Sequence, residues 1–182
     1  MKKGLTRRML AFLLTLAMVL SLLPMAVFAD SRTNPGLYAE PDAEHPFTDV
    51  PEGKYYYDAV YWAYNHDPRI TTGSSGTTFS PNDPCTREQI VTFLWRANGE
   101  PEPTATENPF SDVPEGKYYT KAVLWAVEKE ITAGETTTTF NPKGACTREQ
   151  AVTFLWRAMG KPTPAATTEN PFTDVVEGKY YY

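Results

Sequence analysis

Apolar side chains recur with helical spacing in two segments of the chain, and each segment occurs twice. In the first segment apolar residues stand at positions i, i+3, i+4 and i+7, which predicts an amphipathic helix with one apolar stripe. These positions are Tyr56, Ala59, Val60 and Ala63 in one copy and Tyr119, Ala122, Val123 and Ala126 in the other. The small alanines in both stripes favour close contact with another helix.

The second segment has the same spacing and carries helix start and stop signals in both copies. Its apolar positions are Ile90, Phe93, Leu94 and Ala97, repeated as Ala151, Phe154, Leu155 and Ala158. Thr86 with Gln89, and Thr147 with Gln150, have the spacing of a capping box, so each helix is predicted to begin at the arginine after the threonine. A glycine follows each last turn, with a proline two residues further on.

The helices belong to a repeat with a period of about sixty residues, which indicates a small structural unit used in series. The block at 46–56 recurs at 109–119 and begins a third time at 171–181. We therefore predict a mainly α-helical protein of tandem helix–loop–helix repeats. The expected parts are repeat one at 46–100, a linker at 101–108, repeat two at 109–160, a Pro/Thr-rich linker at 161–170 and the truncated start of repeat three at 171–182.

The loop inside each repeat is rich in glycine and threonine and ends in an aromatic residue, a polar residue and a proline. We expect Phe79 and Phe140 to hold this loop against the core. The copies differ in length at one place, because 65–69 is two residues longer than 128–130, and this predicts an exposed turn.

The N-terminal residues have the features of a signal peptide. Four cations precede an apolar run at 9–23, and 27–29 fits a cleavage site before Asp30. We expect cleavage after residue 29, and the alternative is an uncleaved membrane anchor, because 9–29 could nearly span a bilayer. Residues 30–45 show no periodicity and are predicted to form a flexible lead-in.

Net charge narrows the class of partner. The formal charge of the chain is −5, and removing 1–29, with four cations and no acids, takes it to −9. A nucleic acid partner is not expected, because phosphate binding needs a basic face. No membrane partner is expected after cleavage, and an anionic ligand would have to be held by locally placed cations.

Cys85 and Cys146 are the only cysteines and occupy equivalent positions in the two copies. An oxidising compartment would allow a disulfide. Equivalent sites in repeats seldom lie within the distance of about 7 Å that a bridge requires between Cα atoms. We therefore favour two small buried apolar side chains over a bridge.

The motif Thr-Arg-Glu-Gln opens both second helices and is the main candidate for a binding site. Arg87 and Arg148 stand at the first helical position, where the helix dipole disfavours a cation by about 0.3–1 kcal/mol. A guanidinium beside free N-terminal amides would attract an anion. The alternative is that each arginine is solvated and neutralised by the neighbouring Glu88 or Glu149.

Two other sets of repeated residues are weaker candidates. Trp62 and Trp125 lie off the apolar stripe of the first helices, where they could stack on a sugar ring or pack against a neighbouring helix. Asp49, Asp112 and Asp174 each precede a valine at the start of a repeat, and we expect them to stabilise a turn.

Catalytic constellations are absent from the sequence. His45 and His66 are the only histidines and neither is in a repeated position, and the two cysteines lack metal-ligand spacing. We predict no catalytic site, no metal and no cofactor, and we interpret the chain as non-enzymatic.

The order of these motifs resembles the S-layer homology module. The resemblance rests on the Phe-(Thr/Ser)-Asp-Val opening, the Trp-Ala of the first helix, the Thr-Phe-(Ser/Asn)-Pro loop and the Thr-Arg helix start, and it covers nearly all of 46–182. It implies a bacterial surface protein whose modules bind a secondary cell-wall polysaccharide. It also implies a pseudo-threefold bundle of three modules, with ligand grooves between them, of which the third is truncated here.

The resemblance assigns roles to particular residues. Arg87 and Arg148 would contact an acidic, typically pyruvylated, sugar, and Trp62 and Trp125 would contribute to the same grooves. Gln89 and Gln150 stand where the family usually has glutamate.

The function implied is non-covalent anchoring of an exported protein to the cell wall, at the cell surface. The alternatives are the anchoring part of a longer wall-active enzyme, with its catalytic domain beyond Tyr182, and a structural surface protein that self-associates to complete the bundle.

Overall fold

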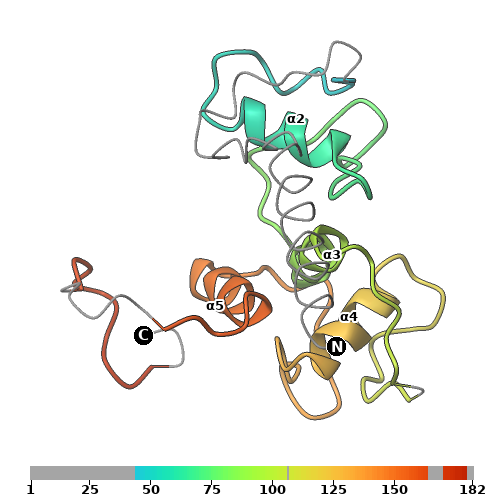
Figure 1. Ribbon diagram of the computed structural model, residues 1–182, viewed down its shortest axis with the longest axis vertical. Helices are drawn as coiled ribbons and strands as arrows, with labels where there is room; N and C mark the ends of the chain where they lie inside the picture. Colours follow the sequence, from blue (N-terminus) through green and yellow to red (C-terminus); the bar gives the residue numbers. More distant parts are fainter. Residues whose placement is uncertain (1–43, 106, 164–169, 180–182) are drawn as a thin grey trace, which may run out of the picture. The chain divides into compact units, whose positions relative to one another are not determined.

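A computed structural model of the chain describes residues 44–105, 107–163 and 170–179. These residues form four α-helices and no strand (Figure 1): α2 (Tyr57–Asn65), α3 (Arg87–Ala97), α4 (Thr120–Glu128) and α5 (Arg148–Ala158). The prediction of a mainly α-helical chain of tandem helix–loop–helix repeats is confirmed. The predicted signal peptide at 1–29, and the lead-in as far as residue 43, lie outside the described residues.

The second helix of each repeat begins where the capping box places it. Thr147 Oγ1 accepts a hydrogen bond from Gln150 N at 3.3 Å, and Gln150 Oε1 accepts one from Thr147 N at 3.1 Å. In the first repeat Gln89 Oε1 accepts a hydrogen bond from Thr86 N at 2.8 Å. Each helix ends at an alanine, and the predicted glycine follows the C-cap residue.

The second helix of repeat one packs into the core of repeat two. α3 contacts α4 and α5, and it lies beside α4 in Figure 1. Its Val91 and Trp95 share one apolar cluster with residues of the second repeat. α2 has a separate, smaller cluster around Phe47, Val50 and Val60. The packed unit therefore combines α3 of repeat one with α4 and α5 of repeat two, and its boundaries differ from those of the sequence repeat.

This packing corrects the predicted apolar stripe of α3. Val91 and Trp95 are buried although neither belongs to the stripe, whereas Ala97, which does, is exposed. The reason is that α4 covers a face adjacent to the one that the periodicity indicated. On α5 the residues equivalent to Val91 and Trp95 are Val152 and Trp156, and they are 63% and 40% exposed.

One aspartate fastens the loop of each repeat to the opening turn of that repeat. Asp49 accepts hydrogen bonds from Phe79 N at 2.8 Å and Ser80 N at 2.7 Å, and Asp112 accepts the equivalent pair in repeat two. The bond from Phe79 N is the main cause that lowers the pKa of the Asp49 carboxyl from its ordinary value of 3.8. These aspartates therefore stabilise a segment distant in sequence, and not only the turn in which they lie.

The loops also pack against aromatic rings of the core, as predicted. Phe140 is fully buried, and Phe79 packs against the cluster that contains Phe47. Gly73 and Gly134 have positive φ values of 76° and 92°, and a Cβ atom at Gly73 would collide with the Phe47 ring. Glycine is required at these positions because an L side chain would fit neither the backbone nor the space.

The cysteines do not occupy the environment that the sequence predicted. Cys85 is exposed and Cys146 is partly exposed, so the expectation of two buried apolar side chains is wrong. Cys146 N donates a hydrogen bond to Cys85 O at 2.9 Å. The two repeats therefore meet at these residues.

The connecting segments are held to different degrees. The turn at 65–69 is exposed at Asn65, Asp67 and Arg69, which confirms the prediction for it. The first part of the linker, 101–105, is fastened to its surroundings, because Trp95 Nε1 donates to Pro101 O at 2.8 Å and Thr104 N donates to Glu128 Oε2 at 2.7 Å.

Shortening Val91, which packs in the core shared by α3 and α4, should destabilise the protein, whereas shortening the equivalent Val152 on α5 should not. We expect Val91→Ala to lower the free energy of unfolding by about 2 kcal/mol, because it removes two buried methyl groups and leaves a cavity. We expect Val152→Ala to change it by less than about 0.5 kcal/mol, because Val152 is exposed. Urea denaturation of the two variants measures this difference, and equal losses would contradict the packing of α3 against α4.

Candidate functional site

The predicted binding motif lies at a junction between repeats, where the loop of repeat two covers the start of α3. Arg87 N donates to Gly144 O at 2.9 Å, and Glu88 N donates to Pro142 O at 3.0 Å. These bonds satisfy two of the amides that a helix leaves unpaired at its N-terminus. The free amides expected in the first copy are therefore occupied by carbonyl oxygens of the next repeat.

The Arg87 side chain is buried in this junction and is 5% exposed. Its Nε donates to Phe140 O at 2.8 Å, and its Cζ lies 4.8 Å from the centroid of the Phe140 ring and 5.6 Å from that of Phe154. Its Nη2 is buried and has no hydrogen-bond partner in the described part of the chain. The alternative of a solvated Arg87 is therefore wrong, and the N–H donors of Nη2 stay unused.

Glu88 does not neutralise Arg87 but binds repeat two. Its carboxylate is almost fully buried, and Oε1 accepts hydrogen bonds from Tyr118 Oη at 2.8 Å and Lys143 Nζ at 2.7 Å. Burial, followed by the hydrogen bond to Glu88, raises the pKa of Tyr118, and the bond to Glu88 raises the pKa of Lys143. Lys143 and Tyr118 were missed by sequence reasoning, although Lys143 stands where repeat one has Asn82 and a comparison of the copies could have drawn attention to it.

The second copy of the motif lies in a different environment. Arg148 is exposed, and neither its side chain nor its backbone N–H has a hydrogen-bond partner among the residues that the structure describes. The same holds for the backbone N–H of Glu149. At α5 the guanidinium is therefore exposed, and the first helix amides have no acceptor in this part of the chain.

The other predicted site residues divide between the surface and the core. Gln89 and Gln150 use Oε1 to cap their helices. Trp62 is 59% exposed, with its ring 5.2 Å from that of His66. Trp125 is 4% exposed and packs in the core beside α3, so its ring is not available to a sugar. We therefore do not retain Trp125 as a ligand residue, because α4 contributes this ring to the helix–helix contact.

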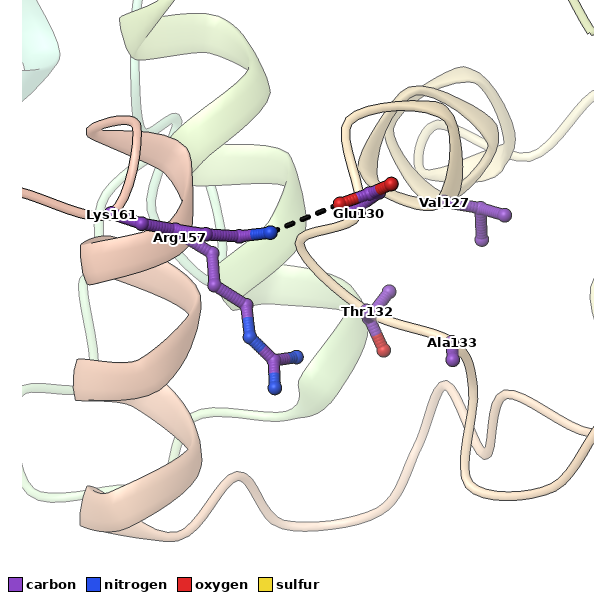
Figure 2. Close-up of a pocket in the computed structure, with 6 residues that line it drawn as sticks. All are labelled: Val127, Glu130, Thr132, Ala133, Arg157 and Lys161. Atoms are coloured by element: carbon purple, nitrogen blue, oxygen red, sulfur yellow. Dashed lines mark hydrogen bonds and ion pairs between the residues drawn. The ribbon is translucent and has the colours of Figure 1, made fainter. Parts of the chain in front are cut away.

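A surface pocket of about 330 Å³ lies at the other end of α5 and not at the predicted arginine site (Figure 2). Arg157 and Lys161 reach into it from α5 and the residues that come after it, opposite Glu130 and Thr132. Lys161 Nζ lies 3.0 Å from Glu130 Oε2, and Arg157 Nη1 donates to Ile131 O at 2.9 Å. Both cations already have protein partners, and the pocket lies between the C-terminal ends of α4 and α5.

Within 44–105, 107–163 and 170–179, no three His, Cys, Asp or Glu residues form a group that could hold a metal ion. None of the helices described in these ranges is long and apolar enough to cross a membrane.

Fold and junction define a class of protein, namely a tandem-repeat helical module in which polar contacts join successive repeats. The family model described as the S-layer homology domain matches residues 46–91 and 109–152. The chain belongs to the S-layer homology family.

Two curated relatives share this sequence over a small part of their own length. An endoglucanase from Bacillus sp. (strain KSM-635) is 31% identical over 153 residues, which are 84% of this chain and 15% of the relative. A cell surface protein from Thermoanaerobacter kivui is 30% identical over 122 residues, which are 65% of this chain and 16% of the relative. The chain thus spans about a sixth of the length of these relatives, and no solved structure matches it.

Neutralising Glu88, which joins the two repeats, should destabilise the protein, whereas neutralising the matching Glu149 should not. We expect Glu88→Gln to lower the free energy of unfolding by about 2 kcal/mol, because it weakens two hydrogen bonds to a buried carboxylate. Glu149→Gln, which changes the matching residue outside such a junction, should leave stability within about 0.5 kcal/mol. Urea denaturation gives both values, and an unaffected Glu88→Gln protein would contradict the role of Glu88.

Proposed function

We propose that this chain anchors an exported bacterial protein non-covalently to the cell wall by binding an anionic secondary wall polysaccharide. Two S-layer homology domains and a relative named as a cell surface protein support a location at the cell surface. The strongly acidic composition supports a ligand that is held by a few local cations and not by the overall field.

The observation that carries the proposal is the set of donors at the two second-helix starts. At α3 these donors bind three loop oxygens, because Phe140 O, Pro142 O and Gly144 O accept from the Arg87 side chain, Glu88 N and Arg87 N. At α5 the equivalent donors have no acceptor in the described ranges, so a carboxylate could supply the oxygens there.

An acidic sugar substituent fits these donors chemically. A carboxylate takes two parallel hydrogen bonds from a guanidinium, and the positive end of the helix dipole adds to the attraction. Arg148 is the main contact in this proposal, whereas the buried Arg87 supports the site by holding the loop of repeat two over the start of α3. A pyruvyl group presents such a carboxylate, and the exposed ring of Trp62 could stack on a neighbouring sugar.

The proposed role requires no catalysis by this chain. The endoglucanase relative supports the alternative that the chain serves as the anchoring part of a longer wall-active enzyme. Both proposals give the described repeats the same binding role and differ only in what is anchored.

A second candidate function is structural self-association, and it is favoured by two matching open faces. α5 exposes Val152 and Trp156 at the positions that α3 covers with α4. α2 exposes Trp62 at the position of Trp125, which is buried on α4. A contact between α5 of one molecule and α2 of another would reproduce the α3–α4 contact in a head-to-tail manner. Further contacts of the same kind would give a pseudo-threefold arrangement if the rotation between molecules closes a ring.

The anchoring proposal predicts that wall binding depends on the helix-start arginines. Purified protein should sediment with purified wall sacculi, and Arg148→Ala should weaken the apparent affinity by about tenfold or more, because charge-assisted hydrogen bonds are lost. Lys129→Ala removes an exposed cation at the C-cap of α4 and should bind as the native protein does. Sacculi treated with mild acid, which hydrolyses pyruvyl ketals, should lose most of the binding.

Two results would refute anchoring by these residues. One is the absence of binding by the native protein, and the other is unchanged binding by the folded Arg87→Ala/Arg148→Ala variant. Because Arg87 is buried, the circular dichroism of that variant must first match the native spectrum.

The self-association proposal predicts a mass that rises with concentration in light scattering. Val152→Asp places a charge on the open face of α5 and should keep the protein monomeric, whereas Thr137→Asp in an exposed loop should behave as the native protein does. A native protein that stays monomeric at all concentrations would exclude this function.

A further inference from the structure

The two cysteines lie directly opposite each other where the repeats meet. Thr86 and Ala145 form an antiparallel bridge, flanked by hydrogen bonds from Cys146 N to Cys85 O and from Arg87 N to Gly144 O, both at 2.9 Å. In antiparallel pairing the residue before one member of a bridge faces the residue after the other. Cys85 therefore faces Cys146.

This pairing places the two Cα atoms at a separation that a disulfide allows. Directly opposite residues joined by such a hydrogen bond have Cα atoms about 5.5 Å apart, and their side chains lie on the same face of the pair. Disulfides usually join Cα atoms about 4.4–6.8 Å apart.

The thiols are accessible, and Cys85 influences the pKa of the Cys146 thiol. Cys85 is exposed and Cys146 is partly exposed, so an oxidant can reach both. Burial raises the pKa of the Cys146 thiol, while the Arg87 cation lowers it and the adjacent Cys85 raises it. Metal binding does not account for the pair, because no third ligand joins them within the described ranges.

We propose that Cys85 and Cys146 form a disulfide that links repeat one to repeat two at their junction. The oxidant is a disulfide, such as a small-molecule or thiol-oxidoreductase disulfide, to which the two thiols give up two electrons and two protons. One sulfur–sulfur bond forms in the protein, and the oxidant's bond is cleaved to two thiols. The new bond fastens the loop of repeat two over the start of α3 and closes a covalent ring that contains α3 and α4.

The test is oxidation of the folded protein by oxidised glutathione, followed by peptide mass mapping without reduction. We expect one linked peptide pair containing Cys85 and Cys146 in the monomer, with a mass lower by two hydrogen atoms than the sum of the free peptides. We expect the thermal midpoint to rise by about 5–10 °C, because the link restricts the unfolded chain. Dithiothreitol should reverse both changes.

A register control separates this geometry from chance reactivity. Ala145→Cys/Cys146→Ser keeps two cysteines but moves one to the position opposite Thr86, where its side chain lies on the other face of the pair. This variant should not form the internal link under the same conditions. The proposal is overturned if the native protein stays reduced, links only between molecules or gains no thermal stability, or if the register variant links as readily.

Discussion

The first backbone amides of α3 have no acceptor within the described part of repeat one, and the loop of repeat two supplies carbonyl oxygens for them. Carbonyl oxygens of Pro142 and Gly144 accept from Glu88 N and Arg87 N, and Cys146 N completes the pairing with Cys85 O. Unpaired amides at a buried helix start are costly, so these bonds hold the second repeat in register with the first. The positions of Arg87, Glu88 and the two cysteines all depend on this pairing.

The same constraint explains why identical motifs behave differently. Arg87 is buried between Phe140 and Phe154 because the loop lies over it, whereas Arg148 has no such cover in the described part of the chain. Val91 and Val152 show the same contrast in the apolar contacts. A helix start can thus serve either as a joint between repeats or as an open cluster of donors, and the presence or absence of a covering loop decides which.

Most of the helical architecture was predictable from the sequence, whereas the partners of the helices were not. Capping boxes and apolar spacing located α3 and α5 because both signals act within a few residues. Those signals could not show that Trp125 faces α3 or that Glu88 binds Lys143, since these contacts join residues of different repeats. The expectation that Cys85 and Cys146 lie apart failed for the same reason, because it rested on how equivalent sites in repeats usually lie and not on which segments pair.

The opening of the third repeat forms its local turn without burying its aromatic residue. In it Asn170 Nδ2 donates to Val175 O at 2.7 Å and Phe172 N donates to Asn170 Oδ1 at 3.0 Å, which reproduces the turn that Asn108 makes in repeat two. Phe172 is nevertheless 63% exposed, whereas the equivalent Phe110 is 4% exposed. The sequence by itself determined the turns and helices, because their hydrogen bonds join close neighbours. Only the tertiary structure decided which faces, arginines and cysteines are covered, because burial requires segments that are distant along the chain.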